Sequence, residues 1–532
     1  MKRGILLSIV IVVFINTAYF PAALRIESSD LETSSLDSVP VSGRFALLSL
    51  QNHNPIYITG NQDFIAQATA EGWQGNGTEG SPYLITGFQI YGTGNGIPGD
   101  PFNPPPIDYS SPTRFLINIK DVDLHFRITD CSLVGAGTYG IYLENVTHAA
   151  ILSNKVTRSD RDGIRLERCL NSTINDNLVY SNSLRGIDLR GTNSSEISNN
   201  SAYSNGVNGI YLGGSWNNTV SNNVAHYNLW HGISIDSLAN YNSIMKNTVY
   251  QNARVGVGLW GQSNYNVLSE NYIYDNEESG ISLFSSDYNV ILFNTIHGNN
   301  EGFSSYETGS NTIKHNEIAY SNYTGLYLFE SKDAILFNNT VFENEEGLIL
   351  SLAWNTSVSF NLISFNRHNG MVIDDSENNN VNNNQISNNG EHGVVINAEA
   401  VGNVITNNEI MGNGGYGIWT ESLENTIADN EIAENGGEVT TYTVISSPQI
   451  VPPLQLWILL FLVLIGGSSV TIIVSIARRS RRSPVYSWKP PSETRSLKYP
   501  SGRENHPKFC PNCGVATAPK DIFCMSCGSL LV

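Results

Sequence analysis

Residues 163–185 read GIRLERCLNSTINDNLVYSNSLR, and units with the same spacing of glycine, asparagine and apolar residues follow one another along the chain. Each unit begins with a glycine that opens a short alternating strand, such as Gly163-Ile164-Arg165-Leu166 or Gly325-Leu326-Tyr327-Leu328. Self-similarity at a fixed period predicts a solenoid of stacked repeats. The glycines recur at spacings of 22 to 24 residues, at Gly140, Gly163, Gly186, Gly209, Gly232, Gly256, Gly280, Gly302, Gly325, Gly347, Gly370, Gly393 and Gly417.

Each of these glycines is followed after 13 to 15 residues by an asparagine. Apolar residues stand three positions before and two positions after it, as Ile174 and Val179 do around Asn177. The unit predicts three short strands with a turn after each, because it is too short for a helix pair and lacks helical periodicity. We expect the coils to stack with parallel, in-register strands. The asparagines are Asn154, Asn177, Asn200, Asn223, Asn247, Asn271, Asn294, Asn316, Asn339, Asn361, Asn384, Asn408 and Asn430.

The asparagine row has a structural role in this interpretation. Asparagine tolerates the left-handed backbone conformation that tight corners need, and its amide hydrogen-bonds to nearby backbone. Identical amides about 4.8 Å apart also bond to one another along a stack of parallel strands. We therefore expect an asparagine ladder inside the solenoid. Cys131 falls in the phase of this ladder, so we expect it to face inward and to form no disulfide with Cys169.

The repeat pattern resembles the right-handed parallel β-helix repeats of the pectate-lyase-like superfamily, and most closely its NosD-like branch. The resemblance covers roughly residues 50 to 437, and the segment from Gly72 to Gly87 resembles the opening coil of such proteins. It implies an all-β, right-handed parallel β-helix, a fold often found in prokaryotic surface proteins. The superfamily includes polysaccharide lyases, hydrolases, epimerases, adhesins and binding proteins. Function must therefore be argued from a site and not from the fold.

Two apolar segments flank the repeats. Lys2 and Arg3 precede an apolar run and small residues, so we expect a cleaved signal peptide rather than an anchor. Residues 454–477 carry no charge and are long enough to cross a bilayer, and the arginines that follow place the C-terminus in the cytoplasm. The predicted order is a signal peptide (1–23), a linker (24–50), the β-helix (51–437), a stalk (438–453), a transmembrane helix (454–477), a basic Pro/Ser-rich linker (478–508) and a zinc ribbon (509–532).

The charge distribution agrees with this topology. The formal net charge of the chain is −19, but residues 477–532 contain ten Lys or Arg and only three acidic residues. The remaining residues contain 19 basic and 45 acidic side chains. An exterior this acidic repels nucleic acid and polyanionic glycans unless cations intervene.

Four of the six cysteines form two C-x-x-C pairs with ten residues between them: Cys510, Cys513, Cys524 and Cys527. Four thiolates at this spacing predict a tetrahedral Zn²⁺ site of the zinc-ribbon type. The site would be structural, because four thiolates leave no open position for a substrate. So small a module folds around its metal, and we expect it to be an adaptor for an unknown protein or nucleic acid.

The outward face of the solenoid carries a charged cluster. Positions two and four after each glycine are expected to point outward, which places Arg165, Glu167 and Asp188 side by side. Glu167 and Asp188 are candidates for an acid–base pair with Arg165 beside them, and acidic residues also suit Ca²⁺. Cross-strand charge pairing on a solvated face produces the same alternation, and we favour that interpretation. No catalytic motif of the superfamily is matched residue by residue.

Four successive coils further along carry an aromatic residue four positions after the glycine: Trp260, Phe284, Tyr306 and Phe329. Sugar rings stack on such rows, and large exposed apolar patches usually mark contacts. We therefore take the row as a candidate ligand-binding surface. The alternative is that loops cover it, or that the stacked rings only stabilise the sheet.

Together these features predict a single-pass protein of the cell membrane. Its extracellular β-helix would be a recognition or scaffold module for carbohydrate or protein, without enzymatic activity. The alternative is a membrane-tethered polysaccharide lyase or hydrolase centred on Glu167 and Asp188. Copper, which the NosD-like resemblance raises, is not expected, because soft Cu(I) sites need clustered Met, Cys and His.

Overall fold

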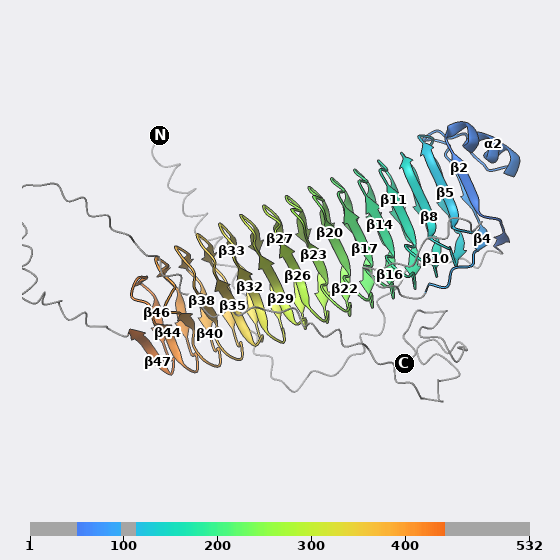
Figure 1. Cartoon of the computed structure of the whole chain (residues 1–532). Coiled ribbons are helices and arrows are strands. Elements are labelled where there is room, and N and C mark those ends of the chain that lie inside the picture. The colour runs from blue at the N-terminus through green and yellow to red at the C-terminus, as the bar shows by residue number, and fades with distance from the viewer. Residues whose placement is uncertain (1–49, 97–112, 442–532) are drawn as a thin grey trace, which may run out of the picture. The chain divides into compact units, whose positions relative to one another are not determined.

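The computed structural model describes residues 50–96 and 113–441, which form a stack of coils along one axis (Figure 1). The predicted signal peptide, transmembrane helix and zinc ribbon lie outside these residues. Within them, no helix is both long and apolar enough to cross a membrane.

Successive strands belong in turn to three parallel sheets, so strands three apart in the sequence are neighbours in space. Ile187 of one coil, for example, lies opposite Ile164 on one side and Ile210 on the other. The predicted three-strand unit and its parallel, in-register stacking are confirmed.

The first sheet contains the strands that the repeated glycines open. It consists of β2 (Ile56–Thr59), β5 (Phe115–Val122), β8 (Tyr139–Val146), β11 (Ile164–Glu167), β14 (Ile187–Arg190), β17 (Ile210–Gly213), β20 (Ile233–Asp236), β23 (Val257–Leu259), β26 (Ser279–Phe284), β29 (Glu301–Tyr306), β32 (Thr324–Phe329), β35 (Glu346–Ser351), β38 (Met371–Asp374), β41 (Val394–Ile396), β44 (Tyr416–Thr420) and β47 (Gly437–Thr441).

The second sheet follows the first within each coil. It consists of β3 (Tyr83–Thr86), β6 (Phe126–Thr129), β9 (Ala149–Leu152), β12 (Thr173–Asn175), β15 (Glu196–Ser198), β18 (Thr219–Ser221), β21 (Ser243–Met245), β24 (Val267–Ser269), β27 (Val290–Leu292), β30 (Thr312–Lys314), β33 (Ile335–Phe337), β36 (Ser357–Ser359), β39 (Asn380–Asn382), β42 (Val404–Thr406) and β45 (Thr426–Ala428).

The third sheet completes each coil. It consists of β1 (Gln51–Asn52), β4 (Phe88–Tyr91), β7 (Ser132–Val134), β10 (Lys155–Thr157), β13 (Leu178–Tyr180), β16 (Ser201–Tyr203), β19 (Val224–His226), β22 (Thr248–Tyr250), β25 (Tyr272–Tyr274), β28 (Thr295–His297), β31 (Glu317–Ala319), β34 (Thr340–Phe342), β37 (Leu362–Ser364), β40 (Gln385–Ser387), β43 (Glu409–Met411) and β46 (Glu431–Ala433).

A helix, α2 (Asn61–Glu71), lies at the β2 end of the stack (Figure 1). Its fully buried Phe64 packs against Trp73, Tyr83 and Phe126, with ring centroids 5.8, 5.3 and 5.1 Å away. The helix thus covers apolar side chains that the first coils would otherwise expose to water.

The predicted asparagine ladder is present. Asn223 is typical: its Oδ1 accepts hydrogen bonds from the backbone N–H and the Nδ2 of Asn200, at 2.9 and 3.0 Å. Its own Nδ2 donates to Oδ1 of Asn247 at 3.0 Å and to the carbonyl of Ile197 at 2.8 Å. Cys131 occupies the ladder position as predicted, because its N–H donates to Oδ1 of Asn154 at 3.0 Å, and both Cys131 and Cys169 are free and buried.

The prediction that the ladder asparagine itself adopts the left-handed conformation is wrong. The residue immediately before it does so, as in Phe293 (φ 54°) and Phe360 (φ 58°). The ladder amide must point into the solenoid to reach the next coil, so the preceding residue makes the corner with its side chain toward solvent. The left-handed residues are Ser153, Asp176, Asn199, Asn222, Lys246, Glu270, Phe293, His315, Asn338, Phe360, Asn383, Asn407 and Asp429.

Two further ladders, which the sequence analysis missed, lie five residues after and five residues before the first one. Their signal is the same 22- to 24-residue period. The second ladder runs through Asn182, Asn205, Asn228, Asn252, Asn276 and Asn299, and resumes after Ser321 at Asn344, Asn366, Asn389, Asn413 and Asn435. The third runs through Asn218, Asn242, Asn266, Asn289 and Asn311, and resumes after Ala334 and Thr356 at Asn379, Asn403 and Asn425.

The repeated glycines are needed for space and not for a positive φ, since none of the thirteen has one. A Cβ atom on Gly209 would lie 2.7 Å from the carbonyl oxygen of Gly232 and 2.8 Å from Nδ2 of Asn228. Each glycine therefore lets the second ladder pass close to the first sheet.

Candidate functional site

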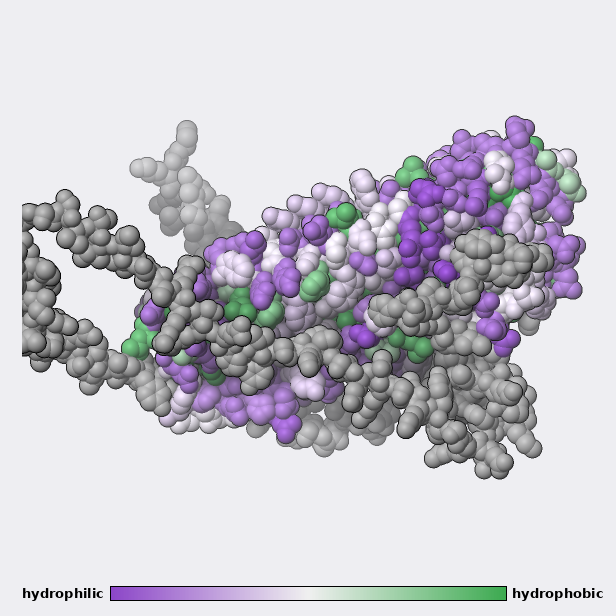
Figure 2. Space-filling view, in the orientation of Figure 1, coloured by the Kyte–Doolittle hydropathy of each residue, from purple (hydrophilic) through white to green (hydrophobic). Residues whose placement is uncertain are grey.

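The charged cluster predicted on the outward face is present, and Figure 2 shows strongly hydrophilic residues gathered over β8, β11 and β14. Arg165 contacts three carboxylates: Nη1 lies 3.4 Å from Asp162 and 3.3 Å from Asp188, and Nη2 lies 3.1 Å from Glu167. Arg168 also binds Glu167, with Nη1 at 2.7 Å from Oε1. Charges of opposite sign therefore alternate, as cross-strand pairing requires.

Asp188 is fully buried beneath this cluster. Arg165, Arg185 and Arg190 approach its Oδ2 at 3.3, 3.6 and 3.1 Å. Burial acts to raise the pKa of Asp188, but the three guanidinium groups outweigh it and hold the pKa below its ordinary value. Asp188 thus stays ionised and has no surface open to a substrate.

Glu167 is held in the same way. Burial acts to raise its pKa, and the hydrogen bond and charge of Arg165 outweigh burial, so the pKa lies below its ordinary value. Neither member of the predicted acid–base pair has the raised pKa expected of a general acid. The nearby buried Asp162 has it instead, because burial and the charge of Asp188 raise its pKa to about 6. The geometry favours cross-strand charge pairing over catalysis, but the expectation of a solvated face is wrong, because Asp162 and Asp188 are fully buried.

The structure brings three of the four predicted aromatic residues together. Phe284, Tyr306 and Phe329 lie opposite one another on β26, β29 and β32. Trp260 turns away from the row, lies over Gly258 and stacks on His231 with centroids 5.2 Å apart. The Tyr306 and Phe329 rings are tilted by 49°, so the row is not a flat platform.

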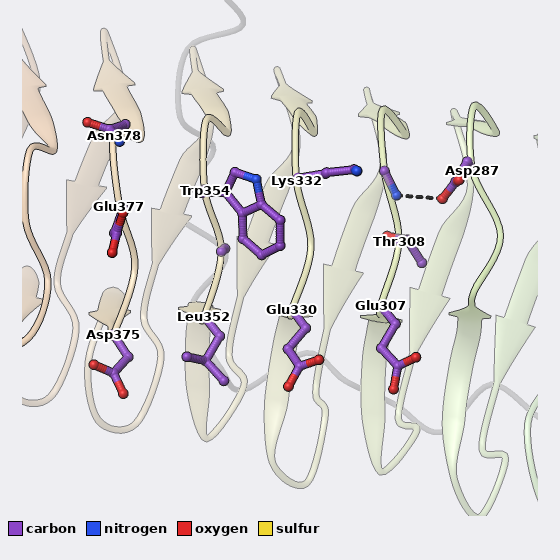
Figure 3. A pocket seen from close by; sticks show the side chains of 12 residues that line it. Asp287, Glu307, Thr308, Glu330, Lys332, Leu352, Trp354, Asp375, Glu377 and Asn378 are labelled. Carbon is purple, nitrogen blue, oxygen red and sulfur yellow. Dashed lines mark hydrogen bonds between the residues drawn. The ribbon is translucent and has the colours of Figure 1, made fainter. Parts of the chain in front are cut away.

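A groove of about 800 Å³ lies beside this row, at the corner between the first and second sheets. One rim is formed by the residues that follow β29, β32, β35 and β38 directly, namely Glu307, Glu330, Leu352 and Asp375. The other rim is a run of parallel bridges that joins Gly309, Lys332, Trp354 and Glu377. Figure 3 shows Trp354 and Lys332 reaching across neighbouring coils on one rim, while Glu307, Glu330 and Asp375 on the other rim point away from them.

The groove combines an exposed indole ring with carboxylates that have no partner among the described residues. Trp354 is 44% exposed. Glu307, Glu330, Asp375 and Glu377 make no side-chain hydrogen bond or ion pair with any other described residue. Lys332, the groove's basic residue, lies over Gly309 on the side of Asp287 (Figure 3). Burial, followed by the charges of Asp374, Glu399 and Glu377, raises the pKa of Asp375 above its ordinary value.

Within residues 50–96 and 113–441, no three His, Cys, Asp or Glu side chains are arranged to hold a metal ion. The predicted zinc ligands Cys510, Cys513, Cys524 and Cys527 lie outside these ranges.

The sequence analysis did not find the groove. Glu307, Glu330 and Asp375 stand five positions after the repeated glycine of their coils. The sequence analysis considered only positions two and four as outward-facing. A signal was available, because this fifth position, at the corner, holds no acidic residue in the coils from Gly140 to Gly280, and holds Glu307, Glu330 and Asp375 here.

The family described as "Right handed beta helix region" matches residues 116–273 and 264–401. No curated protein matches the chain in sequence. Among solved structures, the A-module of mannuronan C-5 epimerase AlgE6 from Azotobacter vinelandii is 16% identical, with a TM-score of 0.37 over 68% of this chain and 89% of that one. The Dettilon tailspike protein gp208 is 13% identical, with a TM-score of 0.34 over 70% of this chain and 64% of that one. Scores this low carry no argument about function.

Proposed function

The chain belongs to the right handed beta helix region family, and from its groove we propose that the β-helix is a carbohydrate-recognition module that binds a glycan chain between β29 and β38. The observation that carries the proposal is the half-exposed Trp354 in a groove that is also lined by Glu307, Glu330, Asp375 and Glu377. A concave site with one aromatic surface and a few convergent polar groups is typical of small-ligand binding.

Each component of the groove matches a part of a sugar. The apolar face of a pyranose ring packs on an indole, and an exposed indole costs less free energy when such a face covers it. Carboxylates are acceptors with several lone pairs, so Glu330 and Glu377 can bind hydroxyl groups around that ring. Tyr306 and Phe329 directly precede Glu307 and Glu330 in the chain, so the predicted aromatic row borders the groove.

The groove favours an extended ligand. Its rims run along the solenoid axis over successive coils, each about 4.8 Å from the next. A chain of sugars lying along the axis would meet one pair of rim residues at each step. The recognition role needs no catalytic pair, in agreement with the buried state of Asp188.

The test is to titrate the full-length protein with neutral oligosaccharides by calorimetry. Trp354→Ala should weaken binding by about tenfold, the upper end of what an aromatic contact contributes. Phe360→Ala is the matched control, because Phe360 is a large exposed aromatic residue of the same coil that lies outside the groove. Binding that survives Trp354→Ala unchanged, or a panel of oligosaccharides that fails to bind at all, would refute the proposal.

In the same proposal the module is exported, held in the cell membrane by residues 454–477, and joined to a cytoplasmic zinc ribbon. The uncharged segment and the two C-x-x-C pairs support this arrangement. Metal analysis of the full-length protein should give one Zn²⁺ per chain, and Cys513→Ser should abolish it. Full zinc retention in that variant would exclude the ribbon. The same metal analysis would also detect Ca²⁺ bound to the extracellular β-helix.

A further inference from the structure

The groove is electrostatically unlike the rest of the outward face. In the cluster around Asp188, every carboxylate named above has an arginine partner within 4 Å. In the groove, Glu330, Asp375 and Glu377 line the same hollow as Trp354 and have no cationic partner among the described residues. The fold therefore pairs its charges at one site and leaves them unpaired at the other.

Unpaired carboxylates in neighbouring coils repel one another. Tyr306 and Phe329 are in register, so Glu307 and Glu330, which follow them, stand one coil step apart. Like charges placed opposite each other in this way are destabilising. Burial, then the charges of Asp374 and Glu399, and then that of Glu377 on the other rim raise the pKa of Asp375. A bound cation would relieve this repulsion.

We propose that the groove selects glycans that carry free amino groups, such as chains of glucosamine, over acetylated or uronate chains. This inference rests on the proposed carbohydrate recognition and adds the charge of the ligand. The amino group of each sugar would be held by Glu330, Asp375 or Glu377 while a ring packs on Trp354 (Figure 3). Ammonium–carboxylate contacts are stronger than neutral hydrogen bonds.

Other cations fit the groove less well. A metal ion needs several ligands converging on one point, and the described residues offer no such arrangement. A basic peptide would bind best by adding a strand to an open sheet edge. The bridges through Gly309, Lys332, Trp354 and Glu377 already pair the backbone of this rim from coil to coil. A uronate chain would add negative charge to an acidic groove and be repelled.

Lys332 sets one boundary of the cationic subsite. Its chain lies over Gly309 and reaches toward Asp287, away from Trp354 (Figure 3). The acidic residues on the side that the Lys332 ammonium group leaves open are thus Glu330, Asp375 and Glu377. We expect the amino sugars to occupy that side.

The experiment compares three oligosaccharides of equal length on the full-length protein by calorimetry: chains of glucosamine, of N-acetylglucosamine and of galacturonic acid. Below the pKa of the amine, the glucosamine chain should bind about tenfold more tightly than the acetylated chain. Raising the salt from about 0.1 M to about 1 M, which shortens the Debye length from about 10 Å to about 3 Å, should remove most of that advantage.

Glu330→Gln should weaken glucosamine binding severalfold and leave binding of the acetylated chain unchanged. Glu431→Gln, at an exposed carboxylate on β46 outside the groove, is the matched control and should change neither. Equal affinity for the acetylated and free-amine chains would overturn the charge inference but leave glycan recognition intact. If none of the three chains binds, both are overturned. A lysine oligomer that binds at least as tightly as the glucosamine chain would also overturn the inference and make the groove a peptide site.

Discussion

Replacing Asn247 with alanine removes one rung of the first asparagine ladder without changing the surface of the protein. Asn247 is fully buried. Its Oδ1 accepts bonds from the N–H and Nδ2 of Asn223, at 2.9 and 3.0 Å, and its Nδ2 donates to the carbonyl of Val220 at 2.9 Å and to Oδ1 of Asn271 at 3.0 Å. Four hydrogen bonds are therefore lost, and their partners remain buried.

The magnitude follows from these four bonds. A net contribution of about 1 kcal/mol each gives a loss of about 4 kcal/mol in the free energy of unfolding. The true loss is expected to be larger, because a buried group left without a partner costs about 1–3 kcal/mol. The cavity left by the amide adds to the cost.

Hydrogen exchange with mass spectrometry is the best assay, because coils of a solenoid contact only their neighbours and open locally. Asn247→Ala should speed exchange in the coils that contain Val220, Asn223 and Asn271, and leave distant coils near α2 protected. The midpoint of chemical denaturation should fall as well.

The control is Asn322→Ala. Asn322 is exposed, has no positive φ and belongs to none of the three ladders, so its loss should change stability by less than about 0.5 kcal/mol. If Asn247→Ala costs no more than Asn322→Ala, the ladder is a by-product of turn chemistry and does not stabilise the stack.

Three further predictions concern other parts of the solenoid. Gly209→Ala should lower the melting temperature markedly, because the new Cβ would lie 2.7 Å from a carbonyl oxygen, whereas Gly80→Ala, with open space around it, should not. The folded-state pKa of Asp162, about 6, lies above the 3.8 of an unperturbed aspartate, so its contribution to stability is full below pH 3.8 and is lost as the pH rises through 6. Denaturation midpoints between pH 4 and 7 should show this slope, and Asp162→Asn should flatten it; an unchanged slope would assign it to other groups. Glu330→Gly should raise the free energy of unfolding by up to about 1 kcal/mol, because Glu330 has a φ of 47° that glycine adopts without strain. The same variant should reduce selectivity for glucosamine chains. A lower free energy of unfolding would contradict the strain argument.

The inner side of the solenoid could be predicted from the sequence because its positions are periodic. Glycine, isoleucine and asparagine recur at fixed phases, and each phase has one physical requirement: space at Gly209, apolar burial at Ile187, and amide bonding at Asn223. The left-handed corner was assigned to the ladder asparagine, although the residue before it adopts that conformation. Asparagine is favoured both in left-handed turns and in ladders, so the residue type alone does not separate the two roles.

The outward side could be predicted only in part. Neighbouring residues such as Arg165 and Asp188 were placed correctly by phase, but their burial depends on how long side chains fold over one another. Trp260 shows the same limit, since its ring turns toward His231 and leaves the aromatic row. The groove was missed because it is formed by corner residues, whose directions the alternation of a strand does not determine.

The corner residues of the groove connect stability to recognition. In earlier coils this left-handed position is occupied by Gly191 and Gly214, which adopt it without strain, but also by Arg168 (φ 54°), Ser237 (φ 57°) and Ser285 (φ 46°). In the groove it is occupied by Glu307 and Glu330, at φ 53° and 47°, which costs roughly 1 kcal/mol for each residue. The third asparagine ladder is also interrupted in these coils, at Ala334 and Thr356. Strained corners therefore occur in many coils, and the groove differs from them in carrying unpaired carboxylates at this position beside the gap in the third ladder.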